Sequence, residues 1–235
     1  MTIRLNKYIA ESGLCSRRNA EKYILEGRVT INNKTITDLS HKINEGDDEV
    51  FVDGEKIKPK KHIYILLNKP KAVITSTKDE RNRKTVIDII KTNEKIFPVG
   101  RLDYNTTGVL LLTNDGDFSN FLTHPKHKIR KIYAVTLNRP LTKEDEIKLL
   151  KGVYINNRKG KFVKINFPDI KKKTVVEVSA VEGRNHFVKD MFSTLGYNVV
   201  ELDRKYFGQF TADVPLGKYR VISKEEIKSV YKNYN

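Results

Sequence analysis

An unbroken apolar run from Val109 to Leu112 is the feature that most constrains the fold of this chain. Turn residues bound it on both sides in the sequence GRLDYNTTGVLLLTNDG, and a short apolar run of this kind predicts a strand inside the core. Asp103 stands just before this strand, between an Arg-Leu pair and the polar turn. The sequence therefore predicts a carboxylate at the mouth of a core strand, where a rigid support suits a nucleophile or an acid–base group.

The rest of this region mixes strands and helices without a regular βαβ rhythm. Strands are predicted over 63–67, 131–137 and 174–181. Helices are predicted at VIDII after Thr85, over 117–122, from Thr142 through Leu150, over 185–195, and after Ser223. We expect an α+β fold with a mixed, mostly antiparallel sheet and flanking helices.

Residues 1–58 predict a smaller, separate unit of helix, turn, helix and short strands. Apolar residues in RLNKYIA recur at helical spacing, and Ser16 is a good N-cap for the second helix. The lysine-rich segment 57–62 has the composition of a linker. We therefore expect one domain over 1–58 and a second over 59–235.

The composition points to a polyanionic partner. The formal net charge is +16, which favours nucleic acid over a membrane, since no apolar run approaches the ~20 residues of a spanning helix. The N-terminus lacks the apolar core of a signal peptide, and the single cysteine, Cys15, excludes an internal disulfide. We expect a cytoplasmic protein.

Two features of the sequence leave alternatives open. Arg17 and Arg18 begin the second helix, where they either bind a phosphate at the helix N-terminus or are simply solvated. Asp103 either caps the turn that follows it or has a functional role.

A calcium loop is disfavoured because its twelfth position would be Asn114 rather than glutamate, and one cysteine with scattered histidines offers no zinc site.

Three segments in this order resemble the bacterial rRNA pseudouridine synthases of the RsuA/RluB type. They are GRLDYNTTGVLLLTNDG, HPKHKIRKIYAV and VEGRNHFVKDMF, and the first carries the G-R-L-D-x-x-T-x-G signature of that family. The N-terminal RLNKYIAESGLCSRRNAEKYILEGRVTIN resembles an S4 domain, a small RNA-binding module. The resemblance covers the chain to about Ile222 and implies an enzyme that isomerises a uridine of ribosomal RNA without a cofactor or a metal.

The resemblance also implies three catalytic residues. Asp103 matches the catalytic aspartate, Tyr133 matches the tyrosine that stacks on the target base, and Arg184 matches the basic residue that pairs with the aspartate. From the residues alone, Tyr133 is equally a core tyrosine of a strand, and Arg184 a surface arginine at a helix start. The family's arginine-rich continuation is replaced here by HFVKDM, which puts RNA recognition in doubt while leaving the three positions intact.

Further basic residues are expected to hold the RNA, mainly through its phosphates. These are Arg4, Lys7, Arg17, Arg18, Lys22, Arg28, Arg101, Lys126, Lys128, Arg130 and Lys131. The expected partner is ribosomal RNA, free or in an assembling particle, with the large subunit preferred, and the expected state is a monomer. The alternatives are a non-catalytic RNA-binding or assembly factor, a tRNA pseudouridine synthase, and a DNA glycosylase.

Overall fold

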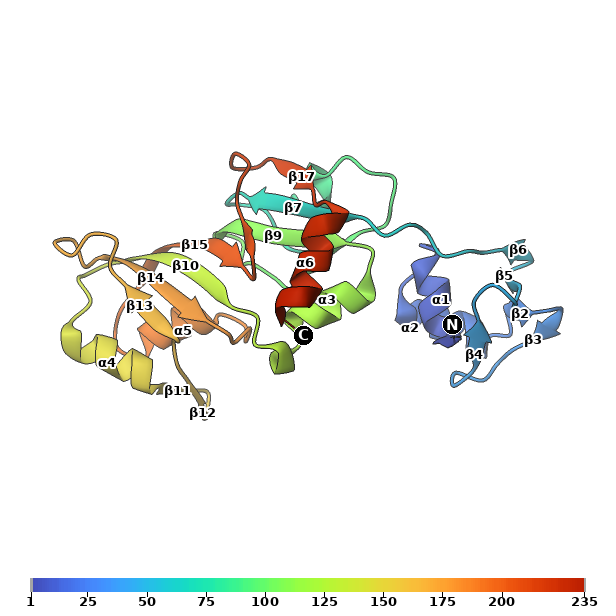
Figure 1. Cartoon of the computed structure of the whole chain (residues 1–235), viewed down its shortest axis with the longest axis horizontal. Coiled ribbons are helices and arrows are strands. Elements are labelled where there is room, and N and C mark those ends of the chain that lie inside the picture. Colours follow the sequence, from blue (N-terminus) through green and yellow to red (C-terminus); the bar gives the residue numbers. More distant parts are fainter. Residues whose placement is uncertain (1, 235) are drawn as a thin grey trace. The chain divides into compact units, whose positions relative to one another are not determined.

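A computed structural model describes residues 2–234 of the chain, which form two compact units (Figure 1). The first unit runs to His62 and includes Asn93–Lys95, and the second comprises Ile63–Thr92 and the chain from Ile96 onward. Among the described residues, no helix is long and apolar enough to cross a bilayer.

The first unit packs two helices against small sheets. Its elements are β1 (Thr2–Arg4), α1 (Leu5–Glu11), α2 (Arg17–Leu25), β2 (Val29–Ile31), β3 (Lys34–Thr35), β4 (Lys42–Asn44), β5 (Val50–Val52) and β6 (Glu55–Lys56). As predicted, the Ser16 side chain caps α2 by accepting a hydrogen bond from the backbone N–H of Asn19. Leu5, Ile9 and Ile24 are fully buried between the helices and the strands, so this unit has its own core.

The second unit is built on a nine-stranded sheet. Its strands are β7 (Tyr64–Lys69), β8 (Phe97–Val99), β9 (Thr107–Thr113), β10 (Lys131–Leu137), β13 (Lys164–Asn166), β14 (Val175–Ala180), β15 (Val199–Phe207), β16 (Phe210–Thr211) and β17 (Tyr219–Val221). The order is β13-β14-β10-β15-β9-β7-β17, with β16 beside β15 and β8 beside β9. The predicted mixed, mostly antiparallel sheet is confirmed, and β15–β9 is the one parallel pair among the named strands of residues 2–234.

The apolar run of β9 separates two cores. Val109 and Leu111 belong to one, whereas Leu110 and Leu112 belong to the other, because successive side chains of a strand point to opposite faces. The first core is covered by α3 (Gly116–Thr123) and α6 (Lys224–Tyr234), and the second by α4 (Lys143–Lys151) and α5 (Phe187–Ser193) (Figure 1). The remaining elements are the short helices η1 (Ile87–Ile89) and η2 (Pro125–His127), and the hairpin of β11 (Val153–Ile155) and β12 (Arg158–Gly160).

Gly108 makes the parallel contact between β9 and β15 possible. Its φ of +104° suits glycine, and a Cβ at this position would lie 2.2 Å from the carbonyl oxygen of Arg204. The two strands pair at only two positions, Thr107 with Asp203 and Gly108 with Arg204. A side chain at residue 108 would therefore separate the two strands.

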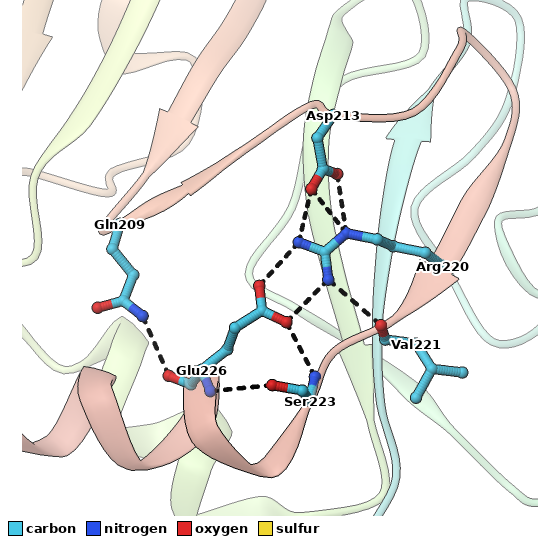
Figure 2. Close-up of polar contacts among 6 residues, drawn as sticks. All are labelled: Gln209, Asp213, Arg220, Val221, Ser223 and Glu226. Carbon is cyan, nitrogen blue, oxygen red and sulfur yellow. Dashed lines mark hydrogen bonds and ion pairs between the residues drawn. The ribbon is translucent and has the colours of Figure 1, made fainter.

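The last helix is fastened to the sheet by a polar network (Figure 2). The guanidinium of Arg220 on β17 bonds the carboxylates of both Asp213 and Glu226. Ser223 and Glu226 form the predicted capping box at the start of α6. This network holds α6 against the core to which Val109 and Leu111 of β9 belong.

Candidate active site

A pocket of about 140 Å³ opens in the second unit next to Asp103. Its walls come from the loop before β9, from β10 and β15, and from the loop that leads into α5. Its polar lining residues are Arg101, Asp103, Thr106, Thr123, Lys131, Tyr133, Glu182, Arg184, His186, Lys189 and Arg204. The apolar side chains of Leu102, Leu202 and Phe207 complete the floor and walls.

The loop that carries Asp103 is held in place by Lys69, whose side chain is fully buried. Its Nζ donates hydrogen bonds of 3.0 Å to the carbonyl oxygens of Pro70, Asp103 and Thr106. Burial lowers the pKa of Lys69 to about 8, and the neighbouring Asp103 opposes that shift. Sequence reasoning missed this lysine, which fixes the backbone on which the carboxylate stands.

The carboxylate of Asp103 has two basic neighbours, Lys189 and His186, both from the segment HFVKDM. Lys189 Nζ lies 2.6 Å from its Oδ2, and His186 Nε2 lies 3.4 Å from its Oδ1. His186 adopts a left-handed conformation (φ +54°) at the residue before α5. The segment that departs from the family pattern thus supplies both partners of Asp103. The carboxylate does not cap its turn; the Asp103 carbonyl oxygen does so by accepting from Thr106 N–H.

The predicted pairing of Arg184 with Asp103 is wrong. The Nη2 of Arg184 lies 2.8 Å from Glu182, and its guanidinium also donates to the backbone carbonyls of Arg158 and Lys159. These carbonyls belong to the β11–β12 hairpin, so Arg184 ties the hairpin to the loop before α5. Lys189 takes the place beside Asp103 because it lies on the first turn of α5, five residues further along the chain.

Tyr133 lies in the pocket wall on β10 and is 9% exposed. Its neighbours across the sheet are Val178 on β14 and Arg204 on β15. The position combines both interpretations from the sequence, since the ring is part of the core and also borders the pocket. Its catalytic role stays a prediction.

Most of the residues expected to bind RNA are exposed. These are Arg4, Arg17, Arg18, Lys22, Arg28, Arg101, Lys126, Lys128 and Arg130. Lys7 is half-buried and lies near Glu11, while the exposed Arg28 pairs with Asp53. Lys131 is the exception: it is 8% exposed and lines the pocket, and its role in RNA binding stays a prediction. The alternation of β10, which turns residues 131, 133 and 135 to the interior, carried the signal that could have revealed its burial.

Comparison with known proteins follows the same division of the chain. The family of RNA pseudouridylate synthases matches residues 63–194, and the S4 domain matches residues 3–49. Ribosomal large subunit pseudouridine synthase B of Bacillus subtilis (strain 168) is 38% identical over 230 residues, covering 96% of this chain and 94% of that protein.

Two further relatives agree with this result. Dual-specificity RNA pseudouridine synthase RluF of Escherichia coli (strain K12) is 34% identical over 237 residues, covering 98% of this chain and 79% of that protein. A solved crystal structure of a pseudouridylate synthase superposes with a TM-score of 0.70 at 32% identity, covering 97% of this chain and 99% of the other.

Proposed function

Because this chain belongs to the RNA pseudouridylate synthase family, we propose that it isomerises a specific uridine of ribosomal RNA to pseudouridine. The observation that carries the proposal is the position of the Asp103 carboxylate at a pocket that Tyr133 also lines. Lys189 bonds this carboxylate, and Lys69 bonds the backbone of the loop that carries it. The S4 domain and the net charge of +16 support an RNA substrate. The 38% identity to the large-subunit enzyme over nearly the whole chain supports the large subunit over the small one.

The reaction breaks the N1–C1′ bond of uridine, turns the uracil, and joins its C5 to C1′. A carboxylate either bonds to the sugar or stabilises the positive charge that develops there, as in glycoside cleavage. Asp103 takes this role, and Lys189 holds its Oδ2 in one direction. Tyr133 offers a ring on which the flipped base can stack.

Water must stay out of the site, because attack by water on C1′ would leave an abasic nucleotide. The buried residues around the pocket, including Leu102 and Phe207, support a dry reaction site once the nucleotide fills it. The exposed Arg101 beside Asp103 is well placed to contact a phosphate at the mouth.

The decisive experiment measures tritium release from [5-³H]uridine in large- and small-subunit rRNA transcripts. Release by the wild type from the large-subunit transcript, with none from Asp103→Asn, is the expected result. Release from tRNA alone would show that the substrate is tRNA rather than ribosomal RNA. Normal RNA binding with no release from transcripts, assembly particles or tRNA would make the chain a non-catalytic RNA-binding factor.

We also propose a division into an RNA-binding domain over 1–58 and a catalytic domain over 59–235, acting as a cytoplasmic monomer. The single cysteine, Cys15, is compatible with a reducing compartment. Sedimentation of the chain with and without rRNA tests the monomer.

A further inference from the structure

Two buried cations line the pocket in addition to the Asp103–Lys189 ion pair. Lys131 is 8% exposed and Arg204 is 2% exposed, and both line the pocket. They come from the paired strands β10 and β15, where Arg204 stands opposite Tyr133, two residues along from Lys131. Lys131 and Tyr133 share the buried side of β10, and Arg204 is the cross-strand partner of Tyr133, so all three residues line the same pocket.

Within residues 2–234, neither cation has an anionic partner. Lys131 Nζ is 3.4 Å from the carbonyl oxygen of Ile129, and Arg204 Nε donates to Val109, while its buried Nη2 has no hydrogen-bond partner. Both charges also lie over the ring of Phe207, at 5.3 Å for Lys131 Nζ and 4.7 Å for Arg204 Cζ. The carboxylates near them are engaged by other cations, in the pairs Asp103–Lys189, Glu182–Arg184 and Asp203–Lys205.

Two like charges buried together without a counter-ion are unfavourable. Burial and the nearby Arg204 lower the pKa of Lys131 to about 8, so the lysine is still charged at neutral pH. Such an arrangement is stabilised when negative charge enters the pocket. Arg101 and His186 are exposed and are available to phosphates at the mouth of the pocket. The two buried cations are therefore left to face the base that stacks on Tyr133.

We propose that Lys131 and Arg204 stabilise the negative charge that develops on the uracil ring when its glycosidic bond breaks. The inference rests on the proposed function. The N1–C1′ electron pair leaves with the base, so the uracil becomes an anion whose charge spreads over N1, O2 and O4. C5 of this anion then bonds to C1′, the C5 proton is lost to a base, and N1 takes up a proton, so the step is an isomerisation with no redox change. Donors aimed at developing charge in a dry site are the most effective form of such stabilisation.

The test compares Lys131→Met with wild type on two RNAs, one with uridine and one with 5-fluorouridine at the target. Single-turnover cleavage is measured with saturating enzyme, as loss of the N-linked nucleoside by mass spectrometry after nuclease digestion. Fluorine withdraws electrons and makes the uracil a better leaving group, so this base depends less on the protein's cations. We expect Lys131→Met to slow uridine cleavage roughly 100-fold, with a several-fold smaller penalty on 5-fluorouridine. Lys131→Arg should retain most of the rate.

A matched control variant and two named outcomes keep the test interpretable. Lys151→Met, at an exposed position at the end of α4, should leave both rates unchanged. Equal penalties on the two bases, or a defect that appears only in RNA affinity, would overturn the inference and make Lys131 a structural or phosphate-binding residue. A wild type that cleaves neither RNA would instead remove the proposed function. Arg204 is not varied because its bond to Val109 and its packing on Phe207 support the sheet itself.

Discussion

Nζ of Lys189 lies 2.6 Å from Oδ2 of Asp103, although 86 residues of sequence separate the two. This contact joins the loop before β9 to the first turn of α5 across the pocket. Lys189 thus holds the carboxylate of Asp103, while Lys69 Nζ holds the backbone carbonyl of the same residue. These two lysines lead to separate predictions, because one touches the reacting group and the other supports it.

Replacing Lys189 should remove most of the activity with little effect on folding. Lys189→Met leaves the Asp103 carboxylate without its closest cation, so we expect single-turnover rates to fall by about 100-fold or more. Lys189→Arg keeps the charge and should recover much of the rate. Unfolding by urea should give nearly the same midpoint for all three proteins; a wild-type rate for Lys189→Met would show that the ion pair has no catalytic role.

Replacing Arg184 should act through the β11–β12 hairpin. Arg184→Ala removes bonds to Glu182 and to three hairpin carbonyls, and we expect a loss of about 1–2 kcal/mol in the free energy of unfolding. Hydrogen exchange in residues 153–160 should become faster than in the wild type. The rate defect should be smaller than that of Lys189→Met, and the opposite ranking would restore Arg184 as the principal basic residue of the site.

Lys69 should make stability depend on pH above neutrality. Its pKa is about 8 in the folded chain and ~10.4 when unfolded, so between these values the unfolded chain binds more protons. The free energy of unfolding therefore gains a contribution from Lys69 as the pH rises through this window, by up to about 3 kcal/mol. Lys69→Met lacks this contribution and removes the ammonium donor from the carbonyls of Pro70, Asp103 and Thr106, so it should be less stable at every pH.

The check is urea unfolding of both proteins at several pH values between 7 and 10. The stability difference between the wild type and Lys69→Met should widen as the pH rises. A difference that is flat or narrows would mean that the buried ammonium keeps its ordinary pKa. Lys131 has a similarly lowered pKa but is present in both proteins, so it cancels from the difference.

Lys131 should set an alkaline limit to the rate. Since its pKa is about 8, the single-turnover rate should fall as the pH rises past that value, when the pocket loses one positive charge. Lys131→Arg carries a guanidinium that stays charged, and its rate should hold to higher pH. Asp103, Lys189, His186, Glu182 and Arg204 also line the pocket and are the same in both proteins. Overlapping pH profiles for the two proteins would exclude Lys131 as the titrating group.

The start of α2 offers a test of the first unit. Arg17 and Arg18 are exposed beside the Ser16 cap, and we expect Arg17→Ala/Arg18→Ala to weaken RNA binding and reduce the salt slope by up to about 2. Lys34→Ala is the matched control because Lys34 is exposed on β3 of the same unit and lies outside the expected RNA-binding set. A double variant with an unchanged slope would mean that both arginines are merely solvated.

Local patterns predicted the elements more reliably than the partners of the charged residues. Ser16, Thr142 and Ser223 cap helices as expected, because a cap depends only on residues three positions away. β10 spans Lys131–Leu137, as its alternation indicated. The sequence alone also located Asp103, because the signature that contains it and the core strand that follows it are both local features.

The pairing of Asp103 could not be predicted in the same way. Residues 185–195 were expected to be helical throughout, but His186 is left-handed and α5 begins at Phe187. That turn decides which basic residue faces the aspartate, and no local pattern in the sequence indicates it. β15 was missed for a related reason: Asp203, Arg204 and Lys205 interrupt its apolar pattern, and its place in the sheet depends on partners far along the chain.

The parallel contact at Gly108 has a consequence for the order of folding on the ribosome. β9 emerges about a hundred residues before β15, the strand that pairs with it at Thr107 and Gly108. Contacts so distant in sequence form late, and a growing chain cannot make them until both partners have left the exit tunnel. The Asp103 loop of a nascent chain thus lacks its neighbouring strand until β15 has been made, and the enzyme gains its activity only after that point.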